Sequence, residues 1–181
     1  MGFGAFCRFG GLLADRIKRM SDKGREWLVG LEGGVRRKAY RDSRGVWTIG
    51  VGQTTISVWG KVRRVQQGDE FPDDSTALRA FYLRLAQDEA AVDAVTRDDI
   101  TQAEFDAFCA ARYNIGPAFD KATFLKLFNE RAPIKLVADS LRANYHRAGD
   151  QPHALDERRA CESDLLRFGV YRLQGQKLSA A

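Results

Sequence analysis

The stretch from Leu31 to Thr55, LEGGVRRKAYRDSRGVWTIGVGQTT, constrains this chain more than any other segment. It places Glu32, Asp42 and Thr48 within a short span that also contains several glycines. A glutamate at a helix end and an aspartate in a hairpin can face each other across a cleft. Two carboxyl groups in that arrangement can act as general acid and base on a glycosidic bond. The rest of the chain must then supply the opposite wall of the cleft.

Local signals around this stretch predict a helix followed by a hairpin. Ser21 is suited to cap a helix that Gly33 and Gly34 would end immediately after Glu32. From residue 35 the pattern is extended, with a turn at 42–45 and a second strand at 46–49. A short third strand, at either 58–59 or 62–65, is left open.

Helical patterns dominate the chain after Pro72. Apolar residues from Leu78 to Val92 recur at steps of three and four, which predicts a long helix capped within 73–75. Further helices are expected from the Thr101–Glu104 capping box, through 124–128, from Pro133 toward Gly149, and over about 154–168.

Strands early in the chain and helices afterwards indicate the α+β class. A length of 181 residues fits one domain. We expect that domain to cover residues 21–181. It would comprise a sheet-bearing lobe over about 32–72 and a helical lobe over about 73–181, joined by the long helix.

Residues 1–20 are expected to form an amphipathic helical extension. The phenylalanines and leucines of this segment lie on one helical face, but Arg8 and Asp15 interrupt its apolar character. No small-residue cleavage site follows an apolar core, so neither a cleaved signal peptide nor a spanning helix is expected. Packing on the body of the protein and docking on a membrane surface both remain open.

The formal net charge of +5 favours an anionic partner such as a cell wall, nucleic acid or a membrane surface. The basic residues are scattered, and no nucleic-acid recognition motif accompanies them. Cys7, Cys109 and Cys161 are expected to be reduced and structural. With His146 and His153 as the only histidines, there is no metal-ligand spacing, and no metal or other cofactor is expected.

Several short motifs in order resemble the active-site signature of the phage-type lysozymes, the endolysins of glycoside hydrolase family 24. They are Glu32-Gly33, Ala39-Tyr40, Asp42, and Trp47-Thr48-Ile49-Gly50. Downstream, Thr101-Gln102, Phe105-Asp106-Ala107, Asn114-Ile115-Gly116 and Arg158-Arg159 with Glu162 resemble that family's central and last core helices. The resemblance covers residues 27–166.

The resemblance implies a lysozyme-like fold and a muramidase that hydrolyses β-1,4 bonds between N-acetylmuramic acid and N-acetylglucosamine during host lysis. It implies that Glu32 protonates the leaving oxygen, that Asp42 stabilises positive charge or activates water, and that Thr48 helps to place the water. For substrate binding it points to Asn114, Arg158 and Trp47, and it implies that Arg158 pairs with the catalytic Glu32. We expect a monomer whose partner is the glycan strands of peptidoglycan, with neither nucleic-acid binding nor stable membrane insertion. It would be made in the host cytoplasm and act on the wall in the periplasm after release.

Two departures from the family pattern bear on activity. Nine residues lie between Glu32 and Asp42, one more than is usual in the family, because both Gly33 and Gly34 are present. An extra residue in a continuing helix would rotate Glu32 by about 100°, whereas two glycines can absorb it at a loosened helix end. Gln53 replaces a histidine that is usual in the family, which predicts altered local hydrogen bonding with activity retained.

Two other functions are compatible with parts of this pattern. The altered spacing leaves a non-catalytic lysozyme-fold module that binds peptidoglycan as the main alternative. A basic nucleic-acid-binding domain is the second, and its affinity would fall steeply with salt.

Overall fold

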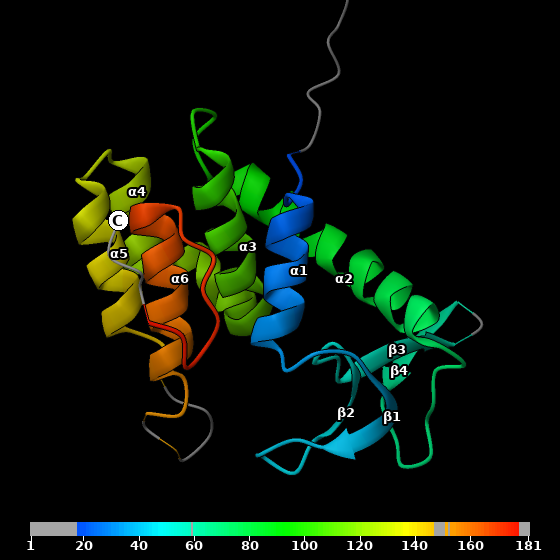
Figure 1. The fold of residues 1–181 in the computed structure, drawn as a ribbon. Coiled ribbons are helices and arrows are strands. Elements are labelled where there is room, and N and C mark those ends of the chain that lie inside the picture. The colour runs from blue at the N-terminus through cyan, green and yellow to red at the C-terminus, as the bar shows by residue number, and fades with distance from the viewer. Residues whose placement is uncertain (1–17, 59, 147–150, 152, 178–181) are drawn as a thin grey trace, which may run out of the picture.

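The computed structural model describes residues 18–58, 60–146, 151 and 153–177. Two β-hairpins lie together near the start of a long helix, and the remaining helices pack into one body beside them (Figure 1). The expected α+β class is therefore confirmed. The predicted extension over residues 1–20 lies almost entirely outside the described residues.

The first hairpin forms where the turn residues predict it. Strand β1 (Arg36–Arg41) pairs antiparallel with β2 (Trp47–Gly50), so that Tyr40 lies opposite Thr48. The register shifts between Arg36 and Tyr40. The hairpin therefore accommodates extra β1 residues without losing its closing turn.

A second hairpin joins β3 (Thr55–Val58) to β4 (Lys61–Arg64). The sequence offered two places for one extra strand; Val58 of the first ends β3, and residues 62–64 of the second lie in β4. It lies beside the first hairpin as a separate two-stranded sheet (Figure 1).

The helices begin where capping residues predict them. In α1 (Asp22–Leu31) the Ser21 side chain accepts a hydrogen bond from the Gly24 backbone N–H, and in α2 (Asp74–Val95) the Asp73 side chain caps in the same way. The predicted capping box of Thr101 and Glu104 opens α3 (Gln102–Ile115). These bonds satisfy backbone N–H groups that have no partner inside the helix.

The other helices complete the body. They are the 3-10 helix η1 (Gly116–Lys121), α4 (Thr123–Asn129), α5 (Ile134–Ala143) and α6 (Asp156–Phe168). Pro133 occupies the N-cap of α5 rather than its first turn, and α6 begins two residues later than expected. Such shifts at helix ends follow from the weak boundary signals there.

Helix α3 lies at the centre of the body, between α1 and the pair α5 and α6 (Figure 1). Its Phe108 is fully buried and packs its ring against the rings of Phe119, Phe124 and Phe128. Each such burial contributes about 1.5–3 kcal/mol to folding. The aromatic cluster therefore fixes η1 and α4 against α3, close to where α3 ends.

Two buried carboxylates anchor the chain just before α1. The Glu89 carboxylate accepts hydrogen bonds from the Met20 backbone N–H at 3.0 Å and from the Arg19 guanidinium at 2.9 Å. The Asp106 carboxylate accepts from the Ser21 backbone N–H at 3.0 Å and from the Tyr171 hydroxyl at 2.8 Å. Helix α1, which ends at the predicted cleft, is thus tied at its start to α2 and α3.

Cys109 and Cys161 are buried free thiols, as the sequence predicts. Burial raises the pKa of both thiols, which suits a structural role. In the described part of the chain no helix is long and apolar enough to cross a bilayer.

Candidate active site

A cleft of about 830 Å³ separates the first hairpin from the helical body. The end of α1 and the turn between β1 and β2 form one side. The α3–η1 junction, the segment between α5 and α6, and α6 itself form the other. The residues that line it are Leu31, Glu32, Asp42, Ser43, Arg44, Asn114, Ile115, Ala118, Ala143, Asn144, Tyr145, His146, Leu155, Arg158, Arg159 and Gln174.

Glu32 enters the cleft from the C-cap of α1. Its backbone N–H still donates to the Leu28 carbonyl at 3.1 Å. Gly33 and Gly34 follow with φ of 83° and 87°, values at which glycine alone is unstrained. The Gly34 N–H returns to the Val29 carbonyl at 2.9 Å, which completes a Schellman ending. The additional residue therefore lies outside the helix, and Glu32 lines the same cleft as Asp42.

The Glu32 carboxylate rests directly against Gly52. A Cβ placed on Gly52 would lie less than 3.0 Å from Glu32 Oε2, and Gly52 has φ of +71°. The Tyr113 hydroxyl of α3 donates to the neighbouring Val51 carbonyl at 2.6 Å. Burial raises the pKa of Tyr113, and the nearby Glu32 charge raises it further, so the hydroxyl keeps its proton. Helix α3 thus holds the backbone on which the Glu32 side chain lies.

Asp42 is held by the turn that it begins. Its Oδ1 atom accepts hydrogen bonds from the backbone N–H groups of Arg44 at 2.9 Å and Val46 at 2.8 Å. The Asp42 backbone N–H donates to the Val46 carbonyl at 2.9 Å. Two N–H donors on one oxygen fix the orientation of the Asp42 carboxyl group. This arrangement fits a group that stabilises positive charge or activates a water.

Arg158 links Glu32 to the buried interior of the helical body. Its Nη1 atom donates to Glu32 Oε1 at 2.6 Å, and its Nε atom donates to Glu162 Oε1 at 2.9 Å. Nη2 donates to the Ala110 carbonyl at 3.2 Å. Burial acts to lower the pKa of Arg158, but Glu32 and Glu162 more than offset this and hold the pKa above its ordinary value. Arg158 is therefore a permanent cation beside the Glu32 carboxyl group.

Arg159 fixes the orientation of Asn114. Its side chain is fully buried, forms an ion pair with Glu162, and donates from Nη2 to Asn114 Oδ1 and from Nε to the Tyr145 carbonyl at 3.1 Å. Arginine offers only donors, so the Asn114 oxygen must face Arg159. Asn114 is exposed in the cleft, where it can present its amide NH₂ group to a ligand.

The structure brings together four of the six site residues suggested by the sequence: Glu32, Asp42, Asn114 and Arg158. Thr48 and Trp47 are not among the residues that line the cleft.

Thr48 is buried in β2, where its hydroxyl donates to the Val46 carbonyl at 3.1 Å. The Arg41 guanidinium lies 4.8 Å from the centre of the Trp47 ring. Gln53, at the position of the second departure, is buried, and its side-chain oxygen accepts from the Val51 N–H at 3.4 Å.

No functional role was predicted for Arg44, Arg159, Glu162 or Gln174, although Arg159 and Glu162 belong to the motif that resembles the family's last core helix. Arg159 and Glu162 lie three residues apart, a spacing that places both on one helix face. That spacing was the available signal. Gln174 reaches the cleft from the segment after α6, and its amide nitrogen lies 3.5 Å from the Leu31 carbonyl. No local sequence pattern predicts that contact.

No cluster of three or more metal-ligating side chains occurs among the residues that the structure describes. The chemistry that the cleft offers is that of two carboxyl groups in different surroundings. The Glu32 carboxyl group is paired with a buried arginine, and the Asp42 carboxyl group is held by backbone N–H groups.

The chain matches a known family over most of its length. A family model described as phage lysozyme matches residues 31–162. The endolysin of Salmonella phage P22 is 36% identical over 138 residues, which cover 74% of this chain and 88% of that protein.

Solved structures extend the likeness to the fold. An endolysin of the Escherichia coli phage FAHEc1 superposes with a TM-score of 0.73 at 29% identity, covering 86% of this chain and 97% of that one. A mutant of P22 lysozyme superposes with a TM-score of 0.68 at 32% identity, covering 82% and 98% of the two chains.

Proposed function

The chain belongs to the phage lysozyme family, and from that premise we propose how its own residues carry out the reaction. The protein is a muramidase of the endolysin type, which hydrolyses bacterial peptidoglycan in host lysis. We assign the cut to the β-1,4 bond between N-acetylmuramic acid and N-acetylglucosamine. The observation that carries the assignment is that Glu32 and Asp42 line one cleft.

Glu32 is the proposed general acid. When it protonates the glycosidic oxygen, it becomes a carboxylate, and the Arg158 guanidinium at 2.6 Å stabilises the charge that develops. This interaction is stronger after proton transfer than before it, which is the condition for lowering the barrier. Arg158 also orients the carboxyl group, since its other nitrogens are fixed by Glu162 and the Ala110 carbonyl.

Asp42 is the proposed carboxylate partner. Its two backbone hydrogen bonds fix Oδ1, while Oδ2 has only a 3.5 Å contact with the Arg44 guanidinium and can face a bound sugar. That oxygen would stabilise the positive charge of an oxocarbenium-like transition state or activate a water. Thr48 keeps its proposed role in placing the water, supported by its bond to Val46, the residue whose N–H holds Asp42. Trp47, which flanks Thr48 in β2, is proposed as an outer contact for the sugar chain.

Asn114 is proposed to recognise the substrate's acetamido group. Arg159 occupies the Asn114 oxygen, so the amide presents donors to the cleft. A donor pairs with the carbonyl oxygen of an N-acetyl group, which both peptidoglycan sugars carry. A free amino group on the sugar would be a poor partner at this position.

We further propose that the protein acts as a monomer, is made in the host cytoplasm and reaches the periplasm by a separate release step. Its net positive charge would speed encounter with the anionic wall.

The decisive experiment compares wild type, Glu32→Gln and Glu26→Gln on outer-membrane-permeabilised cells, with turbidity and released reducing sugar as readouts. Glu26 is exposed on the same helix, so Glu26→Gln is the matched control. Loss of a general acid should reduce the rate by about 10²–10⁴-fold, while the control should clear cells like wild type. Equal clearing by Glu32→Gln and wild type would contradict the assignment of Glu32. Wall binding by wild type without sugar release would favour the binding-module alternative.

A further inference from the structure

The arginines that line the cleft differ in whether their N–H donors already have hydrogen-bond partners. Arg158 and Arg159 are buried, and their donors are taken up by carboxylates, amide oxygens and backbone carbonyls. The Arg44 side chain is 55% exposed. Its guanidinium has one polar partner within the described part of the chain, Asp42 Oδ2 at 3.5 Å from Nη2. Arg44 therefore has N–H donors without partners in the described part of the chain, whereas the donors of Arg158 and Arg159 are bonded.

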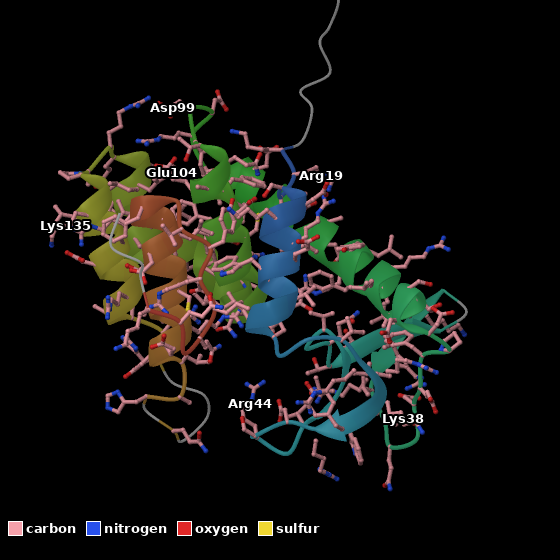
Figure 2. The ribbon with its side chains drawn as sticks, viewed as in Figure 1. Arg19, Lys38, Arg44, Asp99, Glu104 and Lys135 are labelled. Atoms are coloured by element: carbon pink, nitrogen blue, oxygen red, sulfur yellow. The ribbon has the colours of Figure 1, made fainter. Side chains whose placement is uncertain are left out.

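The turn holds Arg44 at the edge of the cleft. The Arg44 backbone N–H is bonded to Asp42, and the Gly45 N–H donates to the Asp42 carbonyl at 2.9 Å. Figure 2 shows Arg44 at the tip of the hairpin, beside the gap that faces the helices, and Lys38 at the other end of the same hairpin. The position of the guanidinium is therefore linked to that of the proposed catalytic carboxylate.

We propose that Arg44 binds a carboxylate of the substrate, and that this contact helps to select anionic glycan strands over neutral ones. The proposal rests on the muramidase function above. Muramic acid carries a lactyl ether that ends in a carboxylate, or in a stem peptide with carboxylates of its own. A guanidinium recognises a carboxylate through two parallel N–H···O bonds, which a neutral hydroxyl cannot match.

The existing contact with Asp42 does not satisfy Arg44. A single interaction at 3.5 Å on an exposed side chain is weak, since exposed ion pairs are screened by water. A substrate carboxylate at the edge of the cleft could therefore bind the guanidinium nitrogens of Arg44 that do not contact Asp42. A distant charge such as Lys38, which pairs with Glu70 at 3.8 Å, offers only the general attraction that every surface cation exerts.

The test is a set of dissociation constants measured by calorimetry in a Glu32→Gln background, where ligands are bound and not cleaved. Arg44→Gln, Arg44→Lys and Lys38→Gln are compared, and Lys38→Gln removes the same charge outside the cleft. Three tetrasaccharides serve as probes. The first is the neutral N-acetylglucosamine oligomer. In the second, N-acetylglucosamine alternates with N-acetylmuramic acid whose lactyl carboxylates are free. In the third, those lactyl groups carry stem peptides.

We expect Arg44→Gln to weaken binding of a carboxylate-bearing probe by about five- to tenfold and binding of the neutral probe by less than about twofold. Arg44→Lys should recover part of the affinity, and Lys38→Gln should match the parent. The probe that responds identifies the source of the carboxylate, lactyl group or stem peptide. Equal losses of affinity for all three probes would overturn the proposal and would mean that Arg44 acts only by holding Asp42. An effect of Lys38→Gln as large as that of Arg44→Gln would overturn it as well. Because these are binding measurements, failure of the muramidase assignment would appear separately, as active Glu32→Gln protein in the clearing assay.

Discussion

A single methyl group at Gly52 should displace the proposed acid without unfolding the protein. In Gly52→Ala the new Cβ would overlap Glu32 Oε2, and the flexible carboxylate would have to move by roughly 1 Å. A misplacement of that size in a reacting group costs about 100-fold in rate. The φ of +71° adds about 1–2 kcal/mol of backbone strain, which corresponds to about 2–8 °C in thermal midpoint for a chain of this length.

Gly68→Ala separates the two effects. Gly68 also has a left-handed φ, +87°, but no atom lies within 4 Å of its added Cβ. Both variants should lose similar thermal stability by calorimetry, while only Gly52→Ala should lose kcat on purified peptidoglycan, measured well below both midpoints. If Gly52→Ala turned over substrate like Gly68→Ala, contact with Gly52 would have no part in placing Glu32.

Two further substitutions examine the buried polar network. Asn114→Asp keeps an oxygen for Arg159 but removes the amide donors, so kcat/KM on N-acetylated wall should fall about tenfold with little change in the thermal midpoint. Unchanged kinetics would refute the donor role of Asn114. Glu162→Gln leaves two buried arginines undercompensated and should reduce the unfolding free energy by about 3–5 kcal/mol in denaturant titrations. Glu130→Gln, which breaks an exposed pair with Lys126, should change it by less than about 0.5 kcal/mol; equal effects of the two would refute the network's contribution.

The features that the sequence predicted well are governed by neighbouring residues. Gly33 and Gly34 end α1 because they adopt left-handed conformations next to the last helical turn, and Ser21 caps the same helix through a bond three residues away. The turn after Asp42 closes the first hairpin by the same kind of local bond. Capping and turn chemistry act within a few residues, so they can be read directly from the chain.

Other features depend on residues far apart in the chain, and the pattern of neighbouring residues does not reveal them. An arginine on a helix is usually solvated, yet Arg158 and Arg159 are buried because Glu162 and Glu32 neutralise them. Glu32 lies 126 residues from Arg158, so no periodicity on α6 could identify that pairing, and only the resemblance to the phage-type lysozymes predicted it. For the second hairpin, the apolar pattern indicated one extra strand at either of two places, and not that two strands pair with each other there.

The two proposed catalytic carboxyl groups are positioned by different kinds of constraint. Asp42 is held by N–H groups of its own turn, so its geometry belongs to the hairpin alone. Glu32 is held from α6 by Arg158 and from the segment after β2 by Gly52, which Tyr113 of α3 anchors through Val51. The helical body and the segment after β2 therefore both contact the Glu32 carboxyl group. Separation of the two parts would remove the Gly52 contact from Glu32 while the turn still held Asp42, so the geometry between the two carboxyl groups depends on how the hairpin packs on the helical body.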